Sequence, residues 1–108
     1  MTILIHNGVS PTSASPKDID SDVWYGFTYT LEEGEVLLSS TWLINDVEVT
    51  PTDTVDSLLF IESVFSGTTT KIRVSGGVRG KRYKVTNRFT TNLVPSDDRS
   101  LLFSIVQL

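Results

Sequence analysis

KRYKVTNRFTT, residues 81–91, is the stretch that decides the fold of this chain. Tyr83, Val85 and Phe89 stand at alternate positions, and basic residues and threonines fill the positions between them. Alternation with a period of two is the pattern of a β-strand with one buried and one solvated face. The sequence therefore predicts a strand here, with its aromatic and aliphatic face turned towards a core.

The residues just before this strand, SGGVRG at 75–80, contain three glycines: Gly76, Gly77 and Gly80. This stretch does not match the Walker phosphate-loop pattern at its first or its last position. A dinucleotide-binding fingerprint or a KH clamp requires neighbouring helices, and the flanking residues predict none. The sequence therefore favours a turn between two strands over a phosphate-binding loop.

Other segments show the same alternation. VWYGFTYTL at 23–31 and VLLSSTWLI at 36–44 flank the turn residues EEGE, where Gly34 is free to take a positive φ, and this arrangement predicts a hairpin. Strands are also predicted at 57–65, 68–75 and 101–108, whereas no window fits a helix.

Strands at this spacing predict an all-β fold, a single immunoglobulin-like antiparallel β-sandwich of about seven strands. Residues 16–108 are expected to form it, after an extended N-terminal arm at 1–15 that is rich in serine and proline. A tyrosine two residues before a core residue is typical of the corner of the sixth strand, where its hydroxyl bonds to backbone. The predicted core residues are Phe27, Trp42, Tyr83, Val85 and Phe89.

Composition argues against catalysis. The chain has 108 residues, the length of one domain. It has no cysteine, so we predict no thiolate site, and its single histidine, His6, makes a catalytic triad unexpected. Asp18, Asp20 and Asp22 have the spacing of a calcium loop but lack its glycine and its closing glutamate. We predict no catalytic, cofactor-binding or metal-binding residue. The first ten residues lack the features of a signal peptide or a membrane span, so synthesis in a cytoplasm is expected.

Charge is distributed unevenly along the chain. Residues 1–62 hold eleven acids against one base, a net charge of −10, whereas residues 63–108 hold eight bases against two acids, a net charge of +6. This asymmetry fits a molecule with two unlike faces that stacks on copies of itself or docks on a partner. Cross-strand pairing within the chain is an equally good explanation.

Four residues are candidates for binding a partner. Arg82, Lys84 and Arg88 share one face of the strand at 81–91 and could contact phosphates. However, no aromatic residue is interleaved among them and the chain is acidic overall. A protein partner is therefore favoured over nucleic acid. We expect the side chain of Trp24 to be exposed, where it could stack on a sugar ring.

Three segments carry a family resemblance: SPKDIDSDVWYGFTYTLEEGEVLLSSTWLI at 15–44, KIRVSGGVRGKRYKVTNRFTT at 71–91 and DDRSLLFSIVQL at 97–108. Together they resemble small neck and tail structural proteins of tailed bacteriophages with an immunoglobulin-like fold, known as fiber-tail adaptor proteins. The resemblance covers roughly residues 16–107. This chain departs from it at Thr28 and Tyr29, where many relatives have aspartate and tryptophan, and residues 1–15 have no counterpart.

The resemblance implies a virion building block without catalytic residues, made in the host cytoplasm. Its partners would be other neck, tail or fiber proteins and copies of itself, with no membrane. The residues it carries over have structural roles: the core tryptophan, the glycine turn, the corner tyrosine, a polar strand residue and the start of the last strand, which are Trp42, Gly76, Gly77, Gly80, Tyr83, Asn87, Asp98 and Arg99. The alternative is a carbohydrate-binding or cell-surface-binding accessory module.

Overall fold

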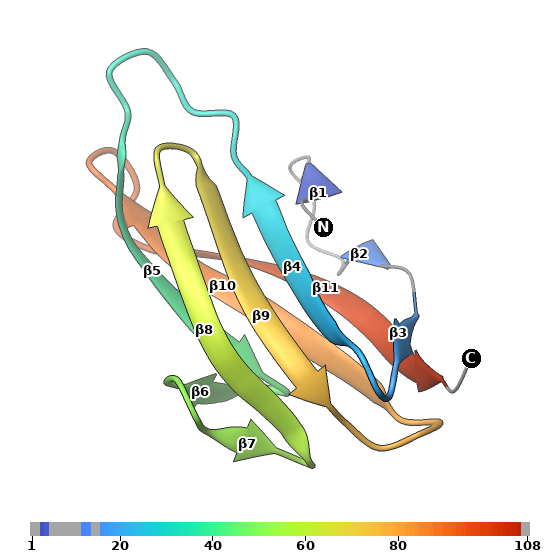
Figure 1. Cartoon of the computed structure of the whole chain (residues 1–108). Coiled ribbons are helices and arrows are strands. Elements are labelled where there is room, and N and C mark those ends of the chain that lie inside the picture. The colour runs from blue at the N-terminus through green and yellow to red at the C-terminus, as the bar shows by residue number, and fades with distance from the viewer. Residues whose placement is uncertain (1–2, 5–11, 14–15, 107–108) are drawn as a thin grey trace.

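The computed structural model describes residues 3–4, 12–13 and 16–106, and within these ranges the chain is entirely strand, turn and loop. Two sheets pack face to face, with β4, β8 and β9 in the front layer of Figure 1 and β5, β10 and β11 behind them. The strands are β1 (Ile3–Leu4), β2 (Thr12–Ser13), β3 (Lys17–Asp18), β4 (Asp22–Thr28), β5 (Leu37–Ile44), β6 (Val47–Val49), β7 (Thr54–Val55), β8 (Leu58–Ser66), β9 (Thr69–Gly76), β10 (Arg82–Thr91) and β11 (Asp97–Val106).

Each sheet is built on three long strands. The first sheet has the order β1-β4-β9-β8-β7, and the second has the order β2-β11-β10-β5-β6 with β3 also pairing with β11. The long strands pair antiparallel, and the two-residue strands β1, β2 and β3 add parallel pairs at one edge of each sheet. The predicted all-β sandwich is therefore confirmed, as is the strand at residues 81–91.

The predicted hairpin between residues 23–31 and 36–44 is wrong. β4 pairs with β9 in one sheet, whereas β5 pairs with β10 in the other, so the intervening segment crosses from one layer to the other. Alternation reports only that one face of a strand is buried, and both strands bury a face in the same core. The EEGE segment is nonetheless a turn, in which Glu35 N donates to Glu32 O and Gly34 has a φ of +80°.

The last strand also begins earlier than predicted, at Asp97 instead of Leu101. Asp97 and Asp98 lie opposite Phe89 and Arg88 of β10, and the Arg88 guanidinium holds Asp98 through two nitrogen–oxygen contacts of 2.9 and 3.1 Å. Asp98, which the sequence placed in a loop, is thus paired with a base across the ladder, and Asp97 pairs with Arg99 of its own strand.

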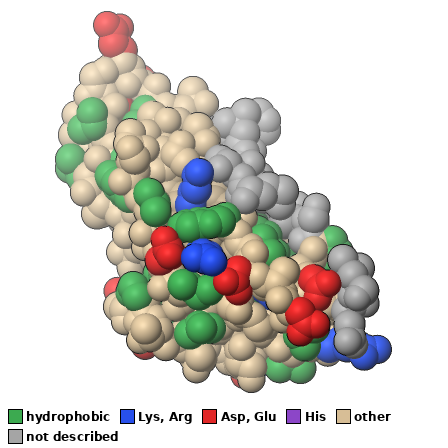
Figure 2. Space-filling model, viewed as in Figure 1, with side chains coloured by type: hydrophobic (Ala, Val, Ile, Leu, Met, Phe, Trp, Pro, Cys, Tyr) green, Lys and Arg blue, Asp and Glu red, His purple; other side chains and the backbone are tan. Residues whose placement is uncertain are grey.

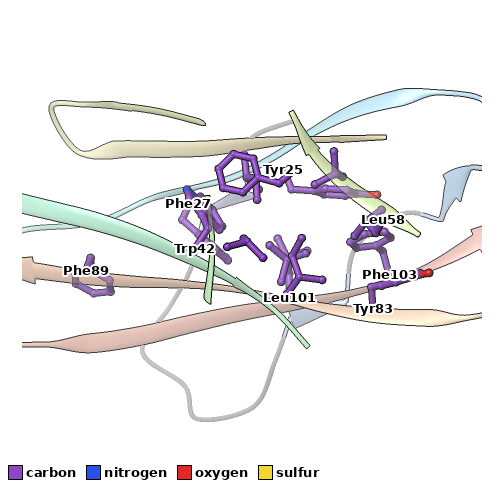
Figure 3. Packing of buried hydrophobic residues seen from close by; sticks show 14 of the residues in the cluster. Tyr25, Phe27, Trp42, Leu58, Tyr83, Phe89, Leu101 and Phe103 are labelled. Carbon is purple, nitrogen blue, oxygen red and sulfur yellow. The ribbon is translucent and has the colours of Figure 1, made fainter. Parts of the chain in front are cut away.

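The core lies between the inner faces of the two sheets (Figure 3). Phe27 and Trp42 stack across it with ring centroids 5.9 Å apart, and Tyr25 stacks on Phe103 at 4.4 Å. The indole of Trp42 is 2% exposed. At the usual coefficient for apolar area, each of these large side chains contributes on the order of 2 kcal/mol to folding. The residues expected in the core, Phe27, Trp42, Tyr83, Val85 and Phe89, are all buried.

The short strands β1, β2 and β3 lie along the β4 and β11 edges. β1 pairs with β4 through Ile3 and Leu4, and β3 pairs with the end of β11. Lys17 is buried, and its ammonium donates to the carbonyl oxygens of Asp18 and Gly76 at 2.7 and 3.0 Å. Most of the arm predicted at 1–15, with His6, lies outside the described residues, so that division of the chain stays a prediction.

Candidate functional site

The glycine stretch between β9 and β10 forms a tight structural corner. Gly76 and Gly77 have φ values of +75° and +105°, which side chains other than glycine rarely adopt. A Cβ atom on Gly77 would lie 2.8 Å from the side chain of Ile105, and one on Gly76 would lie 2.9 Å from the Ser57 carbonyl oxygen. Glycine is required here both for the backbone conformation and for close approach to β11 and to the turn before β8.

Backbone N–H groups of this corner are already used within the protein. Gly77 N donates to Ser57 O at 3.0 Å, Gly80 N to Ile105 O at 2.9 Å, and Lys81 N to Val78 O at 3.0 Å. A phosphate loop needs such N–H groups free to point at the ligand. The stretch is therefore a turn that ties strands together.

Tyr83 completes the corner. Its hydroxyl donates to the Asp56 carbonyl oxygen at 2.5 Å and accepts from Val78 N at 2.9 Å, while its ring is fully buried. The Lys81 ammonium pairs with the Asp56 carboxylate at 2.6 Å, and this hydrogen bond raises the pKa of Lys81. One tyrosine thus joins the β9–β10 turn to the β7–β8 turn.

The basic residues of β10 lie on the outer face of its sheet and are largely neutralised. Lys84 Nζ lies 2.6 Å from the Asp46 carboxylate, and Arg88 is held by Asp98, whose hydrogen bond raises the pKa of Arg88. Arg82 is exposed and has no polar partner among the described residues. Two of the three candidate partner-binding cations are therefore committed to contacts within the chain.

Trp24 lies elsewhere. It is on β4, opposite Arg73, on the outer face of the other sheet, so the structure does not bring it together with Arg82, Lys84 and Arg88. The expectation that Trp24 is exposed is wrong: it is half-buried and has contacts of its own. Arg73 of β9 lies directly opposite Trp24, and a long cross-strand neighbour of this kind can cover part of an outward-facing side chain.

Charges of the two halves of the chain meet across neighbouring strands. Arg73 pairs with Asp22 at 3.0 Å and with Glu62 at 3.4 Å, and the Lys81–Asp56 and Lys84–Asp46 pairs also join a base of the second half to an acid of the first. Figure 2 shows acidic and basic side chains interleaved on the face it presents. The Arg73 pairs are cross-strand, whereas Lys81 and Lys84 reach acids in turns. For these residues, pairing within the chain rather than two oppositely charged faces explains the asymmetry of the sequence.

Asn87 organises a buried polar network inside the sandwich. Its side-chain oxygen accepts from the Tyr29 hydroxyl at 2.9 Å, and its amide nitrogen donates to Ser40 Oγ at 2.7 Å and to Thr41 O at 3.3 Å. Ser40 Oγ in turn lies 2.6 Å from Thr70 Oγ1. Burial raises the pKa of Tyr29. The network links β5 and β10 of one sheet to β9 of the other, and the sequence identified only the asparagine, through the family resemblance.

A cleft of about 740 Å³ opens at the end of the sandwich farthest from the corner, between the segments at 29–35 and 93–97. The Glu35 carboxylate there accepts from Thr91 Oγ1 at 2.6 Å and from Glu32 N at 3.0 Å, and these bonds lower its pKa. Arg99 pairs with Asp97 at 2.8 Å and lies over the Phe89 ring. The charged groups thus hold the two loops in place.

The acids considered as metal ligands have other roles. Asp18 Oδ1 accepts from Asp20 N at 2.9 Å, and Asp22 pairs with Arg73. Across the residues that the structure describes, no three histidine, cysteine, aspartate or glutamate side chains gather in a way that could hold a metal ion. Over the same residues, no helix is long and apolar enough to cross a membrane.

These contacts define a structural β-sandwich, in which the polar clusters of the described residues hold strands, turns and loops in place. The family model of the podophage GP4 fiber-tail adaptor protein gp77 matches residues 17–104, most of the chain, and the chain belongs to this family. It is thus a phage tail structural protein and a component of the virion. No curated protein and no solved structure matched the chain.

Proposed function

We propose that this chain is a non-enzymatic, immunoglobulin-like assembly subunit of the phage neck or tail, which joins tail and fiber proteins through protein–protein contacts. The observation that carries the proposal is the family match over residues 17–104. Its partners are other neck, tail or fiber proteins and copies of itself, and it is made in the host cytoplasm before it enters the virion.

The geometry supports a scaffold of this kind. The glycine corner, the Asn87 network and the Glu35–Thr91 contact fix both ends and the centre of the sandwich, so that loops are held rigidly. A rigid subunit loses little conformational entropy when it docks, which favours association. Exposed apolar side chains, including Leu38, Val64 and Leu93, provide surface that a partner can cover.

The carbohydrate-binding alternative depended on an exposed tryptophan. Trp24 is half-buried, which disfavours a sugar platform at that position. The charge pairing of β10 likewise gives nucleic acid little free positive charge to bind.

The test is a complementation assay with virions. A nonsense mutation in the gene for this chain, in the phage that encodes it, is expected to give particles whose tails lack fibers, and purified chain added back should restore fiber attachment and infectivity. The Trp24→Ala variant should restore both as well as the unmodified chain, since the proposal gives this residue no sugar to bind. Complete, fiber-bearing particles that lack the chain would overturn the proposal.

A further inference from the structure

One long side of the sandwich leaves two strand edges unpaired. β8 has only the two-residue strand β7 beside it, which covers Leu58 and Leu59, and β5 has only β6, which covers Trp42 to Ile44. The backbone of Phe60 is also paired, since its carbonyl oxygen accepts a hydrogen bond from Thr52 N and its N–H donates one to Asp53 O. Beyond these points, residues 61–66 of β8 and 37–41 of β5 have no strand on that side among the described residues (Figure 1).

The two unpaired edges lie close together across the core. Ser40 of β5 and Thr70 of β9 are joined by a 2.6 Å contact between their hydroxyl oxygens, and Thr70 is the β9 residue directly opposite Phe65 of β8. Leu38, Val64 and Phe65 are 61%, 47% and 39% exposed. The two edges therefore form one strip along the side of the molecule, on which Phe65 lies on the inner-face side, with Thr70, and Val64 on the outer face, with Lys71.

The usual protection of edge strands is scarce on this strip. Residues 62–66 of β8 read ESVFS and residues 37–41 of β5 read LLSST, without lysine or proline. Glu62 is the single charge, and it pairs with Arg73. The bulge in β8 lies between Phe60 and Glu62, at the start of the free run, and residues 62–66 continue without another. β5 has a bulge at Leu38, inside its free run, so residues 62–66 of β8 are the part of the strip without lysine, proline or an interrupting bulge. Such an edge is a template for pairing with another strand.

We propose that the β8 edge is a self-association surface, on which β8 of a second copy pairs antiparallel around a two-fold axis at Val64. The choice of a second copy rests on the proposed assembly function and on the register of the edge. A two-fold contact places Val64 opposite Val64 of the copy, Ser63 opposite Phe65, and Glu62 opposite Ser66. No like charges meet, and the two Val64 side chains cover each other.

A differently charged partner fits this edge less well. Nucleic acid or a strongly acidic segment would need free cations along residues 61–66, and the segment holds none. A basic segment would have to compete with Arg73 for Glu62. A neutral, apolar edge is complementary to itself, and two-fold dimers are the commonest symmetric assemblies of soluble proteins. The paired sheets would run continuously from one copy into the other.

The experiment is to measure the mass of the purified full chain by light scattering over a range of concentrations. The unmodified chain should form a dimer, and Val64→Lys should weaken dimerisation by at least about tenfold, because it places two lysines opposite each other. Val78→Lys is the matched control: Val78 is exposed to a similar extent, 44%, but lies at the glycine corner near the other end of β8, and this variant should dimerise normally. Mixing Val64→Lys with Val64→Glu should restore the dimer.

A cross-link gives an independent measure. The chain has no cysteine, so Val64→Cys introduces a single thiol. Opposed residues of an antiparallel pair lie about 4.5–5.5 Å apart at Cα, within the range that a disulfide spans. Val64→Cys should therefore form a disulfide dimer on oxidation, and Val78→Cys should not.

A chain that stays monomeric at its highest soluble concentration would overturn the inference, as would a dimer that Val64→Lys leaves intact or that Val78→Lys weakens equally. The virion complementation assay is independent of these results. A monomer that still restores fibers would retain the adaptor role and assign the β8 edge to another tail protein. A dimer that fails to restore fibers would retain this inference and refute the proposed function.

Discussion

The three tyrosines of the chain form a natural series for measuring what buried hydroxyls contribute. Tyr25, Tyr29 and Tyr83 are 1%, 7% and 0% exposed, so their rings are buried to nearly the same extent. The Tyr25 hydroxyl has no hydrogen-bond partner among the described residues, that of Tyr29 donates to Asn87, and that of Tyr83 makes two bonds at the corner. Tyrosine to phenylalanine therefore removes zero, one or two hydrogen bonds at constant ring burial.

The expected costs follow from those counts. An intramolecular hydrogen bond contributes about 1 kcal/mol net, and a buried polar group left without its partner costs about 1–3 kcal/mol. Tyr29→Phe should lower the free energy of unfolding by about 1–2 kcal/mol, and Tyr83→Phe by about 2–3 kcal/mol, because it leaves Asp56 O and Val78 N unbonded. Tyr25→Phe should be neutral or stabilising, since it removes an unsatisfied buried hydroxyl.

Urea unfolding monitored by tryptophan fluorescence provides the measurement. Midpoints are compared at unchanged slope, so that differences report stability rather than a change in the denatured state. The matched substitutions serve as one another's controls. If Tyr25→Phe cost as much as Tyr83→Phe, hydrogen bonding at these hydroxyls would not be what sets the stability, and the reasoning would be refuted.

Three further outcomes are expected. Burial raises the pKa of Tyr25 and of Tyr29, so these tyrosines ionise first in the unfolded chain, where their pKa is about 10. Their contribution to stability is complete below that pH and falls as the pH rises above it. Melting temperatures measured from neutral to alkaline pH should decline less in the phenylalanine variants. Gly77→Ala should lower the melting temperature more than Gly34→Ala, because both glycines have a positive φ but, of the two, only Gly77 lacks room for a Cβ atom. Equal losses of melting temperature would show that backbone strain alone sets the cost. Asn87→Ala should cost about 3 kcal/mol in urea unfolding by breaking the buried network, and a cost below about 1 kcal/mol would show that the network adds little.

Local patterns were sufficient to predict the strands and the core. Alternation in the segment around Tyr83 predicted which side chains point inwards, because every second residue of a strand faces the same way. The glycine triplet predicted a turn, because its spacing failed the phosphate patterns and the strand that follows leaves no helix to receive a ligand. Such features depend on residues within a few positions of each other, which a sequence displays directly.

Pairing between distant segments could not be predicted in the same way. The Tyr29–Asn87 bond joins residues 58 positions apart, and Tyr83 reaches Asp56 across 27. Nothing in the local pattern distinguishes a tyrosine whose hydroxyl has a partner from one, such as Tyr25, whose hydroxyl has none in the described structure. The charge asymmetry had the same limitation, because a count of acids and bases is compatible both with two charged faces and with cross-strand pairs.

The mistaken hairpin explains why the free edge could not be found from sequence. Had β4 paired with β5 on the side that β10 leaves open, both sides of β5 would have been covered and β5 would not be an edge. Because β4 joins β9 and β5 joins β10, one side of the sandwich ends in β8 and β5, with only short strands to cover them. The crossing between layers at residues 29–36, together with the later crossings after β6 and after β9, determines which strand edges a partner can reach. The order of strands in the sheets, rather than any one motif, is therefore the basis of the proposed assembly surface.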